Sequence, residues 1–143
     1  MRYFLLVSCF LASACQIVGP DDYDGTRKAT LGKPFTLQAD ETATFSESLA
    51  FHLLELTDSR CPTDAACFWA GDVTLVYSLH NPRSFAVSVP DTIRGYLSPN
   101  GNGVLRDTTG AYVVTVEAVW PYPHISRTLP PSRARLVVTP SAN

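Results

Sequence analysis

The sequence predicts an all-β fold: a single antiparallel β-sandwich, Ig-like, with about seven short strands. Three observations favour it. Apolar and polar residues alternate over most of the chain after residue 32, which is the period of half-buried strands. Gly, Pro and Asn interrupt these runs at short spacings, as turns require. No segment shows a sustained helical period with caps. A small closed β-barrel is the alternative that this pattern leaves open.

Strands are expected where apolar residues recur at every second position. Within the second row the phase slips at Leu54, which predicts a β-bulge and turns Leu54 and Leu56 to the opposite face. Turn signals that include Asp40-Glu41 and Pro90-Asp91 separate the rows. In chain order, the expected rows are Phe35, Leu37 and Ala39; Leu49, Phe51 and Leu53; Val73, Leu75, Tyr77 and Leu79; Phe85, Val87 and Val89; Tyr112, Val114, Val116, Ala118 and Trp120; and Ala134, Leu136 and Val138.

The N-terminal residues have the composition of an export signal. Met1-Arg2 supplies one positive charge, residues 3–11 are almost entirely apolar, and Ala12-Ser13-Ala14 provides the small residues of a cleavage site. The apolar run is too short to cross a bilayer. We therefore expect residues 1–14 to be a signal peptide that is removed during export.

Cys15 is the expected first residue of the mature chain and the expected site of lipidation. Residues 11–15 (LASAC) resemble the lipobox of bacterial lipoproteins, whose cysteine carries acyl chains such as palmitate. Cleavage also removes Cys9 and leaves an odd number of cysteines, which calls for an explanation in an exported protein. If Cys61 pairs with Cys67, lipidation of Cys15 accounts for the remainder. Several acyl chains make a firm membrane anchor.

The expected organisation is a signal peptide (1–14), a lipid-anchored tether (15–32) and a β-sandwich domain (33–143). The tether carries Gly, Pro and charges without an apolar period. The expected location is the bacterial cell envelope, at the outer membrane if the source is Gram-negative, because Gln16 rather than Asp follows the cysteine. A soluble secreted or periplasmic protein is the alternative. The formal charge of −2 does not favour nucleic acid, so the membrane and an unknown envelope partner are the expected contacts.

Residues 58–71 (DSRCPTDAACFWAG) form the densest motif in the chain. Two of its cysteines, Cys61 and Cys67, are expected to form a disulfide, because export allows the bond and a redox pair would have the shorter C-x-x-C spacing. Asp58 and Arg60 point the same way in an extended segment. They can pair with each other, or the forked donors of Arg60 can cap loop carbonyls.

Two further residues of this motif have expected structural roles. Trp69 is expected to pack against or beside the disulfide, and Gly71 to let the next strand begin without side-chain bulk. The sequence D-S-R-C-P followed by C-x-W-A-G resembles a motif of small exported bacterial proteins, many of which carry lipoprotein signals. The resemblance extends to the strand before the motif, to Val73–Leu79 and to Tyr112–Pro121. That family is largely uncharacterised, so the resemblance implies a secreted or surface β-domain and no activity.

No constellation of residues indicates catalysis, so a protein that is not an enzyme and holds no cofactor is expected. The three histidines lack the spacing of metal ligands, and no G-x-S-x-G nucleophile elbow occurs. Asp58, Asp64 and Asp72 flank one loop, and hard oxygen ligands suit calcium. A calcium-binding surface domain is therefore an alternative, beside the simpler interpretation that these are turn aspartates.

Binding or a structural role through loops is the expected function. The loop 121–131 holds Tyr122 and His124 between prolines, so their side chains are expected to be exposed outside the core as binding anchors. A stiff loop also loses less entropy when it binds. Trp120, by contrast, is expected to end a core strand. The alternative is a peptidase inhibitor of chagasin-like type that would bind through Gly101–Gly103 and Trp120-Pro121, although the characteristic N-P-T-T-G loop of those inhibitors is absent.

Overall fold

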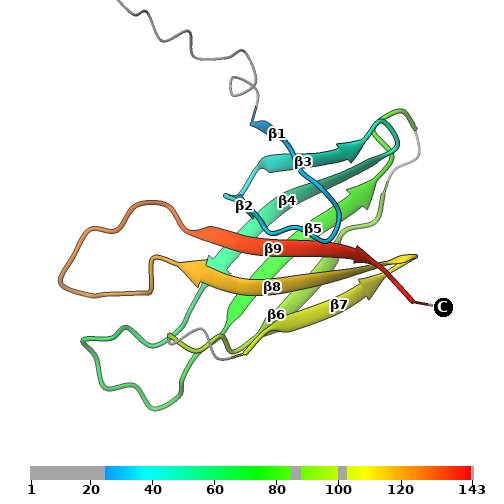
Figure 1. Ribbon diagram of the computed structural model, residues 1–143. Helices are drawn as coiled ribbons and strands as arrows, with labels where there is room; N and C mark the ends of the chain where they lie inside the picture. The colour runs from blue at the N-terminus through cyan, green and yellow to red at the C-terminus, as the bar shows by residue number, and fades with distance from the viewer. Residues whose placement is uncertain (1–24, 85–87, 100–102, 143) are drawn as a thin grey trace, which may run out of the picture.

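The computed structural model describes residues 25–84, 88–99 and 103–142, which form a sandwich of two β-sheets (Figure 1). One sheet has the strand order β1-β3-β4-β5-β6 and the other β2-β9-β8-β7, so the sandwich is confirmed and the barrel alternative is wrong. None of the described residues belongs to a helix that could cross a membrane. The strands are β1 (Thr26–Lys28), β2 (Phe35–Leu37), β3 (Glu41–Ser46), β4 (Leu49–Asp58), β5 (Val73–His80), β6 (Asp91–Gly95), β7 (Leu105–Thr109), β8 (Tyr112–Trp120) and β9 (Arg133–Pro140).

The connectivity differs from the expected one. Strands β3 to β6 pair consecutively in one sheet, and β7 to β9 pair consecutively in the other, so the chain forms two meanders. An immunoglobulin domain instead places strands A, B, E and D in one sheet and C, F and G in the other. The expected Ig-like arrangement is therefore wrong in its connections. The sheets are also not wholly antiparallel, because β1 runs parallel to β3.

The folded domain begins earlier than the expected boundary at residue 33. Strand β1 lies inside the segment assigned to the tether, and the Gly25 carbonyl accepts a hydrogen bond from Thr42 N (2.9 Å). Gly32 N donates to the Val138 carbonyl (2.8 Å), which joins the same segment to the other sheet. The boundary at residue 33 is therefore wrong. The signal peptide 1–14, the lipidation site Cys15 and residues up to 24 lie outside the described residues, so those predictions stay untested.

Besides β1, three strands form where the apolar pattern predicts none: β3, β6 and β7. The pattern assigns Glu41 and Asp91 to turns, yet they begin β3 and β6. In β6 only Ile93 is buried, and one buried residue gives no visible alternation. The strand expected at Phe85, Val87 and Val89 is not supported: residues 85–87 lie outside the described residues, and Val89 is exposed and outside any strand.

A β-bulge interrupts β4, as the sequence predicts. The register against β5 shifts between Leu53 and Glu55, so Leu54 is the extra residue. The bulge also restores the phase, because Leu56 stands opposite Leu75 and packs against the core. The expectation that Leu56 points away from the core is therefore wrong. An inserted residue shifts the side-chain alternation of every residue that follows it.

A second bulge changes the end of β8. The register against β9 shifts between Val116 and Ala118, after which Val119 stands opposite the buried Ala134. Trp120 consequently falls on the outer side and is 38% exposed. The expected continuation of the core row through Ala118 and Trp120 is therefore wrong. As at Leu56, the extra residue of the bulge shifts the alternation of the residues that follow it.

The core lies between the two sheets. Phe51 of β4 stacks on Tyr77 of β5 with ring centroids 5.0 Å apart. The Tyr77 hydroxyl reaches the opposite sheet, where it donates to Asp107 Oδ2 (2.9 Å). Burying each large apolar side chain stabilises the fold by about 1.5–3 kcal/mol. The buried core comprises Leu37, Ala43, Phe51, Leu53, Val73, Leu75, Tyr77, Ile93, Leu97, Val114, Val116, Val119, Ala134, Leu136 and Val138.

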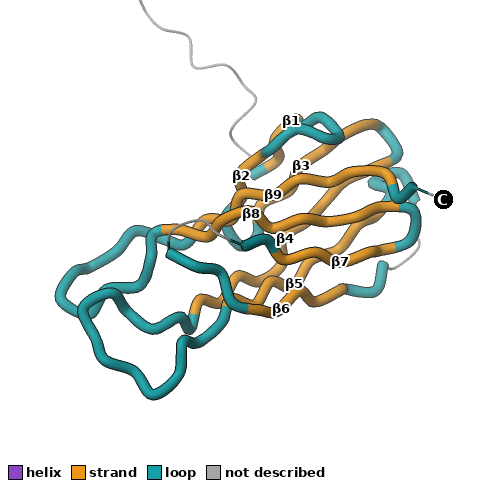
Figure 2. Tube along the Cα trace, turned by 60° about the horizontal axis from the view of Figure 1, so that its bottom comes forward, coloured by secondary structure: helices purple, strands orange, loops and turns teal. Residues whose placement is uncertain are grey.

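Two long loops project from the same end of the sandwich. The segment 59–72 connects β4 to β5, and the segment 121–132 connects β8 to β9. Both views show them side by side beyond the strand ends (Figures 1 and 2). We call these two loops together the loop end. It contains most of the motif residues that the sequence singles out.

Candidate functional site

The first loop is closed by a disulfide and by backbone hydrogen bonds. Cys61 and Cys67 are bridged, with their Cα atoms 5.9 Å apart, which confirms the predicted bond. Ser59 N donates to the Asp72 carbonyl (2.9 Å) and Cys61 N to the Ala70 carbonyl (2.8 Å). The two arms of the loop are therefore paired where they leave the sheet, and only the tip is free of this ladder.

Gly71 is the position at which these two arms approach most closely. Its φ is +73°, and a Cβ atom there would lie 2.0 Å from the Ser59 carbonyl oxygen and 2.7 Å from the Arg60 Cα. Both obstacles are backbone, so neither can turn aside as a side chain would. The sequence indicates a need for little bulk at Gly71. The structure gives a stricter reason, because both the close approach and the left-handed backbone require glycine.

Arg60 joins the two sheets at the loop end. Its guanidinium binds Asp58 in bidentate fashion, Nε to Oδ1 (2.8 Å) and Nη2 to Oδ2 (2.5 Å), which confirms the predicted pair. It also donates to the Leu97 carbonyl (3.3 Å) and the Val119 carbonyl (2.8 Å), so it caps carbonyls as well. The Arg60 and Asp58 side chains are only 2% and 6% exposed. This buried ion pair therefore holds together the ends of β4, β8 and the segment after β6.

Tyr122 packs on this cluster and does not stand free in solvent. Its ring centroid lies 4.2 Å from the guanidinium carbon of Arg60, a cation–π geometry. The residue is half-buried, and burial raises the pKa of its hydroxyl. The expected role of Tyr122 as an exposed binding anchor is therefore wrong. Its ring covers the ion pair from the side of the second loop.

His124 is held between the loops by Asp64. Its Nδ1 lies 2.8 Å from Asp64 Oδ2, and its side chain is only 16% exposed. The same carboxylate accepts from Ile125 N (2.8 Å) and Ser126 N (3.0 Å), and the Ile125 N–H above all lowers the pKa of Asp64 to about 2. The expected exposure of His124 is therefore wrong. Asp64 instead ties the disulfide loop to the second loop.

The three aspartates considered for calcium do not form one site. Asp58 binds Arg60, Asp64 binds the amides of the second loop, and Asp72 binds Arg94 Nε through Oδ2 (2.6 Å). Within residues 25–84, 88–99 and 103–142, no group of three or more potential metal ligands comes together. The calcium interpretation built on these three carboxylates is therefore wrong.

Large apolar side chains are exposed at the loop end. Phe68 is fully exposed and contacts Trp69 edge to face, with ring centroids 6.4 Å apart. Trp69 is 74% exposed and Ile125 is 70% exposed, so the expectation that Trp69 packs against the disulfide is wrong. Sequence reasoning did not select Phe68 or Ile125. The signal that was available is the adjacent Phe68-Trp69 pair, which lies in a loop outside any apolar alternation.

A hollow of about 560 Å³ lies beside Trp69. Trp69 forms the aromatic wall of the hollow, and its polar walls come from Ser59, Asp72 and Arg94. The Ser59 hydroxyl donates to Asp72 Oδ1 (2.9 Å), and the hydrogen bond with Arg94 holds the pKa of Asp72 below its usual value. The hollow therefore combines an exposed indole with an ion pair whose carboxylate is fixed by two neighbours.

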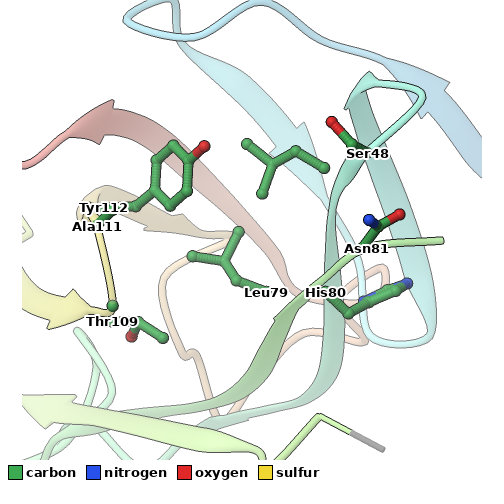
Figure 3. Close-up of a pocket in the computed structure, with 9 residues that line it drawn as sticks. Ser48, Leu79, His80, Asn81, Thr109, Ala111 and Tyr112 are labelled. Atoms are coloured by element: carbon green, nitrogen blue, oxygen red, sulfur yellow. The ribbon is translucent and has the colours of Figure 1, made fainter. Parts of the chain in front are cut away.

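A smaller hollow of about 290 Å³ lies at the opposite end of the sandwich (Figure 3). Leu79 of β5 and Tyr112 of β8 stand on its walls, and Ser48 and Asn81 belong to the turns beside it. It involves none of the motif residues. The loop end thus has the larger of these two hollows and the exposed aromatic residues together.

The loop expected to serve a peptidase inhibitor is only partly described. Residues 100–102 lie outside the described residues, so the contact assigned to Gly101–Gly103 stays untested. Trp120, the other expected contact, is partly exposed and is followed by a cis peptide bond to Pro121. Comparison of the chain with models of protein families, with curated proteins and with solved structures gave no match.

Proposed function

We propose that this protein is a lipid-anchored component of the bacterial cell envelope, and that its non-catalytic β-sandwich binds an envelope partner through the loop end. The observation that carries the proposal is the joining of two loops into one body that exposes Phe68, Trp69 and Ile125. Phe68 and Trp69 are in contact, and contiguous exposed apolar groups mark interaction sites more often than scattered ones do.

The rigidity of the loop end supports a binding role. The disulfide closes the first loop, and the buried Arg60 cluster fixes its base. Asp64 and the hydrogen bond from Thr63 N to the Pro123 carbonyl (3.1 Å) attach the second loop to the first. A surface that is already ordered loses little conformational entropy on binding, so its aromatic side chains make effective anchors.

The expected anchor is compatible with binding close to a membrane. Cys15 and Gly25 are ten residues apart, and ten extended residues span at most about 35 Å. A lipid on Cys15 would hold the folded domain within that distance of the bilayer. Partners within the envelope are therefore the ones the loop end would meet.

Membrane anchoring is tested with the variant Cys15→Ser. We expect the unmodified chain in the membrane fraction, with the added mass of acyl chains on Cys15, and the variant in the soluble fraction. Intact-mass analysis of the mature N-terminus and fractionation of both forms give the answer. Two soluble forms without acyl mass would refute the anchoring part of the proposal.

The binding surface is tested with a photoreactive amino acid placed at one exposed position at a time. Phe68 and Ile125 report on the loop end, and Asn81, which is exposed beside the hollow at the opposite end, is the matched control. Irradiation of intact cells should give a crosslinked product from Phe68 and Ile125 and none from Asn81. Equal crosslinking from all three positions, or none from the loop end, would refute binding through these loops.

A further inference from the structure

We propose that the hollow beside Trp69 is a binding site for a neutral saccharide. The inference rests on the proposed function, because it names the chemical class of ligand that the loop end takes. It is drawn from three features of the hollow: an exposed aromatic face, polar groups fixed at its side, and the absence of net charge in the ion pair that lines it.

The aromatic face is that of Trp69. The side chain is 74% exposed and lines the hollow, whereas the neighbouring Phe68 is fully exposed and does not line it. A pyranose ring has C–H groups on its faces and hydroxyls around its edge. Such a ring can therefore lie flat on an indole while its hydroxyls turn to polar groups nearby.

The polar groups that hydroxyls need are those of Asp72 and Arg94. Arg94 uses Nε for its bond to Asp72, and its side chain is 70% exposed, so the guanidinium offers further N–H donors to a ligand. The carboxylate offers acceptors, since each of its oxygens has more than one lone pair. Paired donors and acceptors match sugar hydroxyls, which both donate and accept.

The charge of the hollow favours a neutral ligand. The Arg94 guanidinium and the Asp72 carboxylate are paired at 2.6 Å, so their charges cancel within the site. The hydrogen bond with Arg94 lowers the pKa of Asp72, so the carboxylate stays ionised at neutral pH. A uronic acid would be attracted by Arg94 and repelled by Asp72, and the reverse holds for an amino sugar, so a charged sugar gains no net attraction from the pair.

The carboxylate and the loop backbone of the site are held in place before any ligand arrives. Asp72 N donates to Ser59 Oγ (3.3 Å), and Ser59 Oγ donates to Asp72 Oδ1 (2.9 Å), so the carboxylate has a fixed direction. Arg94 projects from β6, and Trp69 lies between the disulfide and the close approach at Gly71. The volume of about 560 Å³ falls in the range of about 300–1,000 Å³ that is usual for small-molecule sites.

The experiment uses the full mature chain with Cys15→Ser, so that it can be purified without detergent. It is applied to an array of neutral oligosaccharides, built from hexose and N-acetylhexosamine units, and of matched oligosaccharides that carry uronic acids. Hits are titrated in solution by tryptophan fluorescence. The chain has two tryptophans, so the variant Trp120→Phe leaves Trp69 as the sole reporter.

We expect neutral oligosaccharides to bind and to change Trp69 fluorescence. The exposed-surface variant Trp69→Ala should lower affinity by about tenfold or more, Arg94→Ala should also weaken binding, and Val89→Ala should leave it unchanged. Melting curves of all three variants check that the fold is retained. Val89→Ala is the control, because it shortens an apolar side chain that is 82% exposed, lies outside the loop end and does not line the hollow.

Three results would overturn the inference: no neutral saccharide binds the folded chain, the uronic-acid series binds better, or Val89→Ala weakens binding as much as Trp69→Ala. The failure of the inference can be told from that of the proposed function. If no saccharide on the array binds but Phe68 crosslinks to a protein, the saccharide site is refuted and the proposed binding of a partner through the loop end still stands. If no saccharide binds and no crosslink forms, both the saccharide site and the proposed binding function are refuted.

Discussion

The buried pair of Arg60 and Asp58 should be the main determinant of stability at the loop end. In the variant Arg60→Met, the Asp58 carboxylate, which is 6% exposed, loses its counterion, and the Leu97 and Val119 carbonyls lose their guanidinium donor. Breaking a buried ion pair by removing one partner costs about 3–5 kcal/mol, because an uncompensated charge stays in the interior. We expect a loss of that size in the free energy of unfolding.

The double variant Asp58→Asn with Arg60→Met separates charge from packing. It removes the uncompensated charge, and replacing both members of a buried pair by neutral groups costs far less than removing one. We therefore expect the double variant to be more stable than Arg60→Met alone by at least about 1 kcal/mol. A double-mutant cycle completed with Asp58→Asn gives the coupling energy of the pair.

The assay is urea denaturation of the oxidised chain, followed by circular dichroism. The control is Arg94→Met, which makes the same substitution in an ion pair whose arginine is 70% exposed. Exposed pairs contribute about 0–1 kcal/mol, so this variant should differ little from the unmodified protein. If Arg60→Met costs no more than Arg94→Met, or if Asp58→Asn does not rescue it, the buried pair does not hold the loop end together and the reasoning is refuted.

Three further predictions follow from the same geometry. Gly71→Ala should destabilise the fold by more than about 2 kcal/mol in the same denaturation assay, because its Cβ would lie 2.0 Å from a backbone oxygen. Gly110→Ala is the control: its φ is +57°, but a Cβ there would meet no atom within 4 Å, so it should cost only about 1 kcal/mol. Asp64 stabilises the fold at pH values above its unfolded pKa of 3.8, and this contribution is lost as the pH falls toward the folded pKa of about 2. The variant Asp64→Asn should therefore have a Tm that depends less on pH between these two values. An unchanged dependence of Tm on pH would contradict this prediction. Tyr122→Ala with His124→Ala should lower stability by about 2 kcal/mol or more, because both side chains pack between the loops; an unchanged Tm would show that they are free surface residues.

Local patterns predicted the parts of the fold that depend on neighbours in sequence. Alternation places Val73, Leu75 and Tyr77 in the core, and the phase slip at Leu54 marks the bulge. The pairing of Asp58 with Arg60 needs only an extended segment, because residues two apart share a face. Strands β1, β3, β6 and β7 escaped the pattern, since few of their residues are buried and short or edge strands show little alternation.

The exposure of the loop residues could not be predicted by the same means. Tyr122 and Trp69 are both aromatic residues in loops and are not distinguished by sequence pattern. Tyr122 nevertheless packs on Arg60, whereas the Trp69 side chain is exposed to solvent. Which of them is covered depends on the loop that lies against it. The bulge in β8 likewise decides that Val119 is buried and Trp120 is partly exposed. The apolar alternation of β8 does not predict this bulge.

The sequence by itself predicted the β-sandwich and the disulfide, and it offered the Asp58–Arg60 pair as one of two roles for Arg60. Each follows from alternation or from short spacing, which act within a few residues of the chain. Only the tertiary structure decided what the loop end is, because its contacts cross long stretches of sequence. Arg60 reaches the Val119 carbonyl 59 residues away, and Asp64 reaches Ser126 62 residues away. Such hydrogen bonds depend on how the sheets and loops meet in space, and a donor and an acceptor so far apart leave no periodic signal in the sequence.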